Sequence, residues 1–120
     1  MVLFSGPATV ADAAAHLGRS MHVVESGGEL DVRLSPGSEP VLRVGLSAEP
    51  HVAVEAVELA EMHSLPALRR LDRRFEVAFD DLDAVLDEYT TLFEVQATLQ
   101  DLTGGYLFLS WNSSVVAPGD

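Results

Sequence analysis

FEVAFDDLDAVLDEYTTLFEVQATLQDLTGGYLFLSW, residues 75–111, is the stretch that decides the predicted fold. Its first five residues alternate large apolar side chains, at Phe75, Val77 and Phe79, with a charged and a small one. A period of two is typical of a β-strand with one buried face. The stretch therefore begins with a predicted strand.

The middle of this stretch predicts one long amphipathic helix. Asp80 is placed to cap its N-terminus, and Asp81 and Asp83 put negative charge in the first turn, where free backbone N–H groups favour it. Gly104 and Gly105 end the helix, because glycine adopts the left-handed conformation that many helix ends need. The stripe at helical spacing consists of Leu82, Val85, Leu86, Tyr89, Leu92, Phe93, Gln96 and Leu99.

The stretch closes with YLFLSW, residues 106–111, which is largely apolar at both alternating sets of positions. This pattern is typical of an interior strand that is covered on both faces. Strand, helix and strand together predict a βαβ unit with a right-handed crossover.

The chain before residue 75 predicts a short helix and then a β-meander. Thr9 is a plausible N-cap and Gly18 a stop for a helix over residues 9–18. Residues 21–47 hold three short apolar runs separated by turn sequences that contain glycine and proline, which predicts three antiparallel strands.

Residues 9–20 resemble the opening helix and turn of helix-turn-helix regulators, in which an alanine-rich helix ends in Leu-Gly. The resemblance implies that a recognition helix with basic or polar residues follows. The next segment, MHVVE at residues 21–25, is instead β-branched and acidic. We therefore interpret residues 9–18 as a helix that packs on the surface of the domain.

A second main helix is predicted from Pro50 to His63, with Pro50 in the first turn and glutamates on its solvent side. Pro66 should break this helix, and Ser64 is placed to cap a further short one.

These elements predict an α+β two-layer sandwich that forms a single domain over residues 1–120. The mixed sheet has about five strands, the meander followed by the βαβ unit, and packs two main helices plus the short N-terminal helix. The all-apolar last strand indicates that the N-terminal helix or another subunit covers its second face. Residues 113–120 are expected to be frayed.

Charge is the strongest global feature of the sequence. The chain has 19 acidic residues against 7 arginines and no lysine, which gives a net charge of −12. A negative field repels phosphate backbones, so we expect no nucleic-acid partner, whereas a basic protein partner is favoured. Arginine without lysine is typical of a GC-rich, bacterial genome.

The location of the protein is predicted from what the sequence lacks. The chain has no cysteine, which excludes disulfides and thiolate chemistry and favours a cytoplasmic location. No apolar run approaches the roughly 20 residues that a membrane span needs. The N-terminal MVLFSGP has no basic region typical of a signal peptide. We therefore expect no membrane association.

No catalytic or metal-binding motif is found. The four histidines (residues 16, 22, 51 and 63) form no HExxH motif, and no GxSxG motif surrounds a serine. The acidic run at residues 80–88 follows helical rhythm, so helix capping explains it better than a calcium loop does. We therefore expect a non-catalytic protein without metal or cofactor, although a site assembled in space from scattered side chains is a further alternative.

Two groups of residues are candidates for binding. Trp111 and Asn112 follow the last strand, and Asp80 follows the strand at residues 75–79, so parallel strands would bring all three to one edge of the sheet as a ligand site. Arg69, Arg70, Arg73 and Arg74 form the second group, which is suited to an anion. The alternative for the arginines is pairing with the neighbouring carboxylates.

Small size, acidity and the lack of a catalytic motif predict a non-catalytic protein-binding domain. It would act as an inhibitor-, immunity- or chaperone-type partner, or as a subunit that associates with itself, for example as a homodimer. The alternative is a small-ligand sensor or carrier domain with a pocket near Trp111, Asn112 and Asp80.

Overall fold

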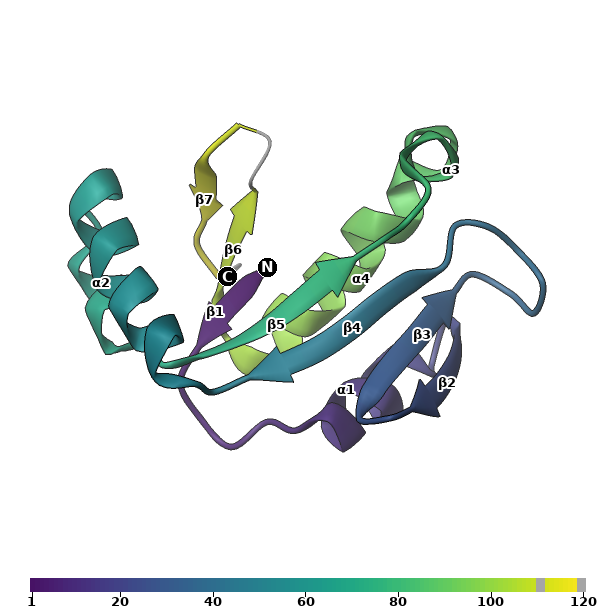
Figure 1. Cartoon of the computed structure of the whole chain (residues 1–120), viewed down its shortest axis with the longest axis horizontal. Coiled ribbons are helices and arrows are strands. Elements are labelled where there is room, and N and C mark those ends of the chain that lie inside the picture. The colour runs from purple at the N-terminus through teal and green to yellow at the C-terminus, as the bar shows by residue number, and fades with distance from the viewer. Residues whose placement is uncertain (110–111, 119–120) are drawn as a thin grey trace.

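Strand β1 (Val2–Phe4) lies inside a seven-stranded antiparallel sheet in the computed structural model, which describes residues 1–109 and 112–118. The strand order within these residues is β2-β3-β4-β5-β1-β6-β7 (Figure 1). The remaining strands are β2 (His22–Ser26), β3 (Glu29–Arg33), β4 (Leu42–Ser47), β5 (Arg73–Ala78), β6 (Tyr106–Leu109) and β7 (Ser114–Val116). The helices are α1 (Val10–Leu17), α2 (Pro50–His63), the 3-10 helix η1 (Pro66–Arg70), α3 (Leu82–Asp87) and α4 (Tyr89–Thr103).

The predicted elements before residue 75 are confirmed. Strands β2, β3 and β4 form the antiparallel meander, with Val23 opposite Val32 and Leu30 opposite Val44. Thr9 caps α1 through a capping box with Asp12. Ser64 differs from its prediction, because it ends α2 in the left-handed conformation and does not cap η1.

The α+β class is correct, but the prediction of a mixed sheet of about five strands is wrong. All pairings between the described strands are antiparallel. Strands β5 and β6 run parallel to each other, as the βαβ unit requires, yet β1 lies between them and is antiparallel to both. Three residues are too few for periodicity to indicate a strand, so the sequence did not predict β1.

The two-layer prediction also needs correction, because helices cover both faces of β1. Val2 and Phe4 pack in one core with α1 and α4, and the Phe4 ring stacks on Phe75 at 5.3 Å between centroids. Leu3 points the other way and packs in a second core with α2 and η1. Figure 1 shows α2 and α4 on opposite sides of β1.

Strand β6 confirms the expectation of an interior strand with two apolar faces. Leu107 and Leu109 belong to the core under α4, whereas Tyr106 and Phe108 pack against the core under α2. Within the chain, the cover on the second face is therefore α2 and not the N-terminal helix.

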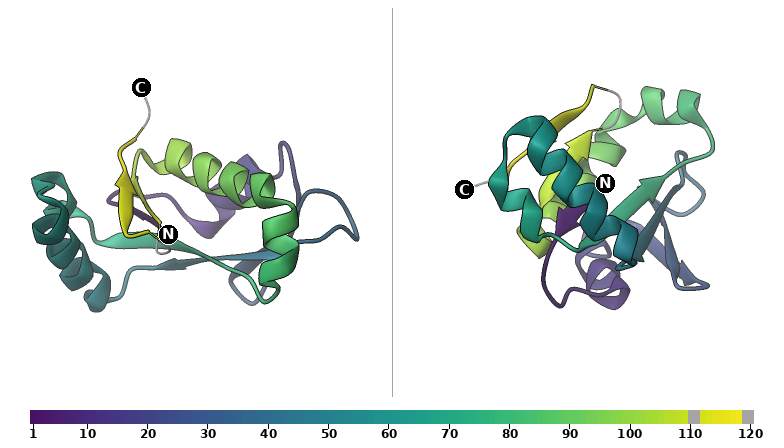
Figure 2. Two further views of the ribbon diagram at one scale, coloured as in Figure 1. Left: turned by 90° about the horizontal axis from the view of Figure 1, so that it is seen from above. Right: turned by 60° about the vertical axis from the view of Figure 1, so that its left-hand side comes forward.

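The single long helix predicted after residue 80 is divided into α3 and α4. Glu88 leaves helical geometry at φ −132° and ψ 51°, and α3 turns sharply away from α4 (Figure 2). The N-cap of α3 is Asp81, whose carboxylate accepts from the backbone N–H of Ala84 at 3.1 Å, and not Asp80.

The segment expected to be frayed contains β7, which pairs with β6. The Gln100 side chain of α4 holds this hairpin, donating from Nε2 to the carbonyl oxygens of Gly105 at 3.1 Å and of Val116 at 2.9 Å. No helix within residues 1–109 and 112–118 has the length and apolarity needed to cross a membrane.

The approach of Gly105 to β1 generates a stability prediction. A Cβ at Gly105 would overlap the carbonyl oxygen of Leu3, which the sheet holds in place. We expect Gly105→Ala to lower the free energy of unfolding by about 3 kcal/mol, the upper end of the range for overpacking.

Gly104→Ala is the matched control. It places a Cβ in open space at φ 62°, so it should cost only the left-handed strain of about 1–2 kcal/mol. Urea denaturation of both variants measures the difference. Equal losses would contradict the close approach of Gly105 to β1.

Candidate functional site

Asp80 and Asn112, two of the three residues predicted to form a ligand site, contact different parts of the structure. Both oxygens of Asp80 accept from the Arg43 guanidinium, at 2.8 and 3.0 Å, so Asp80 is joined to β4. These hydrogen bonds and the charge of Asp80 raise the pKa of Arg43 above its ordinary value. The Asn112 side chain instead accepts from the backbone N–H and the hydroxyl of Ser114, in the β6–β7 turn. Trp111 lies outside the described residues.

The structure does not gather the four candidate anion-binding arginines at one point. Arg69 pairs with Glu61 of α2 at 3.2 Å, and Arg70 is exposed at the end of η1. Arg73 donates to the carbonyl oxygen of Gly6 at 2.6 Å. Arg73 and Arg74 are successive residues of β5, so their side chains leave opposite faces of the sheet.

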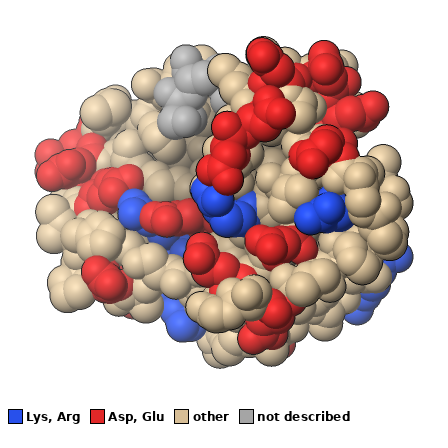
Figure 3. Space-filling view, turned by 45° about the vertical axis from the view of Figure 1, so that its right-hand side comes forward, with Lys and Arg blue, Asp and Glu red and all other residues tan. Residues whose placement is uncertain are grey.

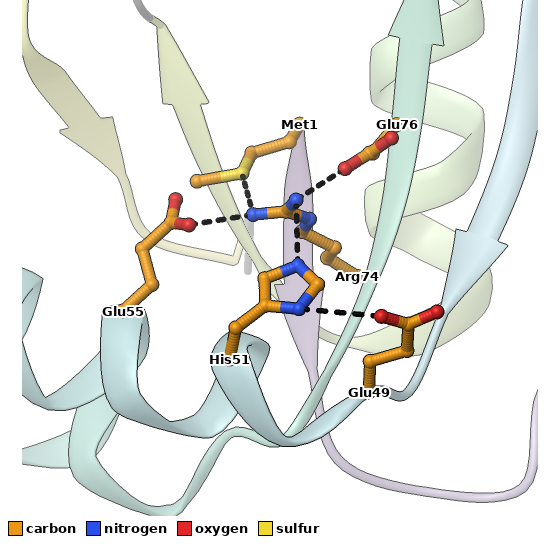
Figure 4. Close-up of polar contacts among 6 residues, drawn as sticks. All are labelled: Met1, Glu49, His51, Glu55, Arg74 and Glu76. Carbon is orange, nitrogen blue, oxygen red and sulfur yellow. Dashed lines mark hydrogen bonds and ion pairs between the residues drawn. The ribbon is translucent and has the colours of Figure 1, made fainter.

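Arg74 is largely enclosed, with 14% of its side chain exposed. Figure 4 shows its guanidinium between Glu55 of α2, at 2.7 Å, and Glu76 of β5. The guanidinium nitrogen that pairs with Glu76 also lies 3.3 Å from Nε2 of His51. Two carboxylates therefore already balance the charge of Arg74, and the network ties α2 to the sheet.

His51 completes this network through its second ring nitrogen. A guanidinium can only donate, so this contact is a hydrogen bond in the His51 tautomer whose Nε2 accepts and whose Nδ1 carries the proton. Nδ1 faces the carboxylate of Glu49 at 3.5 Å. The cluster thus pairs the Arg74 cation with two carboxylates and connects it through His51 to Glu49.

A different feature, which the sequence did not predict, stands out at the corner between α3 and α4. An apolar groove opens there to solvent and encloses a cavity of about 400 Å³. Leu82, Leu86 and Tyr89 along it are each more than half exposed, with Leu86 at 61%. The groove is lined by Phe79, Leu82, Val85, Leu86, Tyr89, Leu92 and Phe93.

The break at Glu88 creates this groove. Val85 and Leu92 remain buried in the core under α4, whereas Leu82 and Leu86 are carried away from the sheet with α3. Tyr89 and Phe93 form the facing wall, with their rings edge to face at 5.6 Å. The weak helix formers Thr90 and Thr91, in the first turn of α4, are the signal in the sequence that could have indicated two helices.

Carboxylates border the groove on its α3 side. Asp81, Asp83, Asp87 and Glu88 are all exposed on α3 or at its ends. In Figure 3, which brings this side of the molecule forward, acidic side chains gather over the α3 end. An apolar surface with a negatively charged border is therefore the main surface feature of this region.

A second cavity, of about 370 Å³, adjoins the groove. The segment 79–82 forms the wall between them, because Asp80 and Asp81 line this cavity while Phe79 and Leu82 line the groove. Its other lining residues are Asp31, Glu39, Pro40, Val41 and Arg43. Within residues 1–109 and 112–118, no group of three or more histidine or acidic side chains is arranged to hold a metal ion.

Comparison of the chain with protein-family models, with curated proteins and with solved structures gave no match.

The Arg74 network generates the second prediction. Arg74→Met keeps the aliphatic length but leaves Glu55 and Glu76 without their cation, so we expect the free energy of unfolding to fall by about 1–3 kcal/mol. Adding Glu55→Gln should restore part of this loss, because it removes one of the two carboxylates that face each other.

Arg69→Met is the matched control, since Arg69 makes one ion pair with about half of its side chain exposed. Its expected cost is below about 1 kcal/mol. Urea denaturation of the wild type, Arg74→Met, Arg74→Met with Glu55→Gln, and Arg69→Met measures these differences in the free energy of unfolding. A loss at Arg74 no larger than at Arg69 would show that the network does not hold α2 to the sheet.

Proposed function

We propose that this chain is a small, non-catalytic protein-binding domain whose partner is a basic protein. The observation that carries the proposal is the apolar groove between α3 and α4, bordered by exposed carboxylates. This chain would act on the basic protein as an inhibitor, an immunity protein or a chaperone.

The exposure of the groove supports a macromolecular partner. Scattered apolar residues on a surface are ordinary, but a contiguous apolar patch with a polar border is typical of an interaction site. Leu82 and Leu86 are exposed side by side on a helix of only six residues. Burial against a partner would remove this apolar area from water.

The charge supports a basic partner. The excess of acidic over basic residues gives a net charge of −12, and several of these carboxylates lie on α3 beside the groove. Complementary charge accelerates encounter and disfavours partners of the wrong sign. The same field argues against nucleic acid, which offers phosphates of like charge.

The chemistry of the groove favours protein binding over the small-ligand alternative. Small-ligand sites usually place several polar groups where they converge on the ligand. Among the residues that line this groove, the Tyr89 hydroxyl is the sole polar side-chain group. Asp80, the described candidate nearest to it, is already engaged by Arg43.

The test starts from affinity purification on the immobilised full chain and continues with each captured protein purified and titrated back by calorimetry. We expect at least one partner of high isoelectric point that binds in a defined stoichiometry. Because surface charges are screened by salt, its association rate should fall at least about tenfold between about 0.05 and 0.5 M NaCl.

An unrelated protein of similar size and net charge, immobilised in the same way, is the control for nonspecific ionic binding. The proposal fails if every captured protein also binds this control with equal affinity. It also fails if the sole partners that bind again are acidic and insensitive to salt.

A further inference from the structure

We infer that the α3–α4 groove receives an amphipathic helix of the partner, with apolar residues three or four positions apart and arginine or lysine beside them. This inference rests on the proposed function and adds the surface and the chemistry of the partner segment. It depends on the shape of the groove, its length and the charge around it.

The shape of the groove suits a helix. Leu82 and Leu86 are four residues apart on α3, and Tyr89 and Phe93 are four residues apart on α4. Side chains at this spacing form the ridges into which a neighbouring helix packs its own side chains. The two pairs are the walls of the groove, and the buried Val85 lies at its floor.

The length of the groove limits the contact to a short helical segment. The six residues of α3 span about 9 Å at 1.5 Å per residue, which matches about two turns of a partner helix. Two turns present two or three apolar side chains on one face. The expected motif is therefore short, such as apolar residues at positions i, i+3 or i+4, and i+7.

The charge around the groove selects the flanking residues of that helix. Asp87 and Glu88 lie at the corner, and Asp81 lies on the wall that the groove shares with the acidic cavity. Arg43 is the cationic side chain lining that cavity, and Asp80 balances its charge. Cationic side chains beside the apolar face of the partner helix would meet the exposed carboxylates of α3 and of its two ends.

A second copy of this chain is a poorer occupant. In a two-fold dimer formed through the groove, the same acidic surface of both copies, including Asp87 and Glu88 of each, would lie at the contact. A contact with α2 of a second copy meets a similar difficulty, because the exposed Glu58 lies between its exposed Val54 and Met62. Repulsion between like charges therefore disfavours both contacts between copies, and a basic protein of another sequence is the better occupant of the groove.

The test uses a phage-displayed library of 15-residue peptides selected on the folded wild-type chain. We expect enrichment of sequences with apolar residues at helical spacing and with arginine or lysine between them. The best peptide is then synthesised with a fluorophore, and its affinity is measured by anisotropy. Circular dichroism establishes that each variant keeps the wild-type fold.

Two pairs of variants locate the site. Leu82→Ser with Leu86→Ser should weaken peptide binding at least about tenfold, because these side chains are expected to supply much of the buried apolar contact. The matched control is Val54→Ser with Met62→Ser, which removes two equally exposed apolar side chains from α2. This control should change the affinity less than about twofold.

A second comparison tests the charge. Asp87→Asn with Glu88→Gln should weaken binding several-fold at low salt, and the difference should nearly vanish at about 0.5 M NaCl. Glu58→Gln, an exposed carboxylate on α2, should have no effect.

The outcomes separate this inference from the proposed function. Peptides that bind the Leu82 and Leu86 variant as tightly as the wild type would overturn the groove as the site and leave a protein-binding function standing. Enriched peptides that are acidic or uncharged would overturn the basic helix as the occupant. A selection without enrichment would also count against a helical segment, and the proposed function would then depend on the calorimetry with whole proteins.

Discussion

The packing of β1 between β5 and β6 is the constraint on which the rest of the structure depends. Val2 pairs with Phe75 on one side and with Leu107 on the other, and Val2, Leu3 and Phe4 are almost completely buried. Three residues thus join the meander to the C-terminal hairpin and contribute side chains to both cores. Their burial explains why α2 and α4 lie on opposite faces of the sheet. Helix α4 covers Val2 and Phe4, and α2 covers Leu3, whose side chain points the other way.

Local patterns in the sequence were sufficient to predict the elements that have a repeating apolar pattern, a turn sequence or a helix cap of their own. The meander has alternating apolar runs and glycine turns, α1 has its capping box, and α2 begins at Pro50. The short strands β1 and β7 carry no such signal, because three residues complete no period. Their place is determined by pairing with strands distant along the chain, which no local pattern contains.

The candidate site was harder to predict for a related reason. The apolar residues from Leu82 to Leu99 fit one continuous helix, and the same spacing also fits two helices that meet at Glu88. Which of these forms depends on tertiary packing, since Val85 and Leu92 are held in the core while the chain between them bends. Tertiary structure also decides what the arginine cluster can bind. The alternation of β5 places Arg73 and Arg74 on opposite faces of the sheet, and the packing of α2 brings Glu55 to Arg74.

The bend at Glu88 also connects stability with the function that we propose. A continuous helix would offer no concave corner, whereas the bend leaves Leu82 and Leu86 in water on a short helix. The surrounding carboxylates offset the resulting risk of self-association, because apolar contact between two copies would require like charges to approach. A partner with cations beside its apolar face meets no such repulsion, so the same residues that keep copies of this chain apart would favour a basic protein.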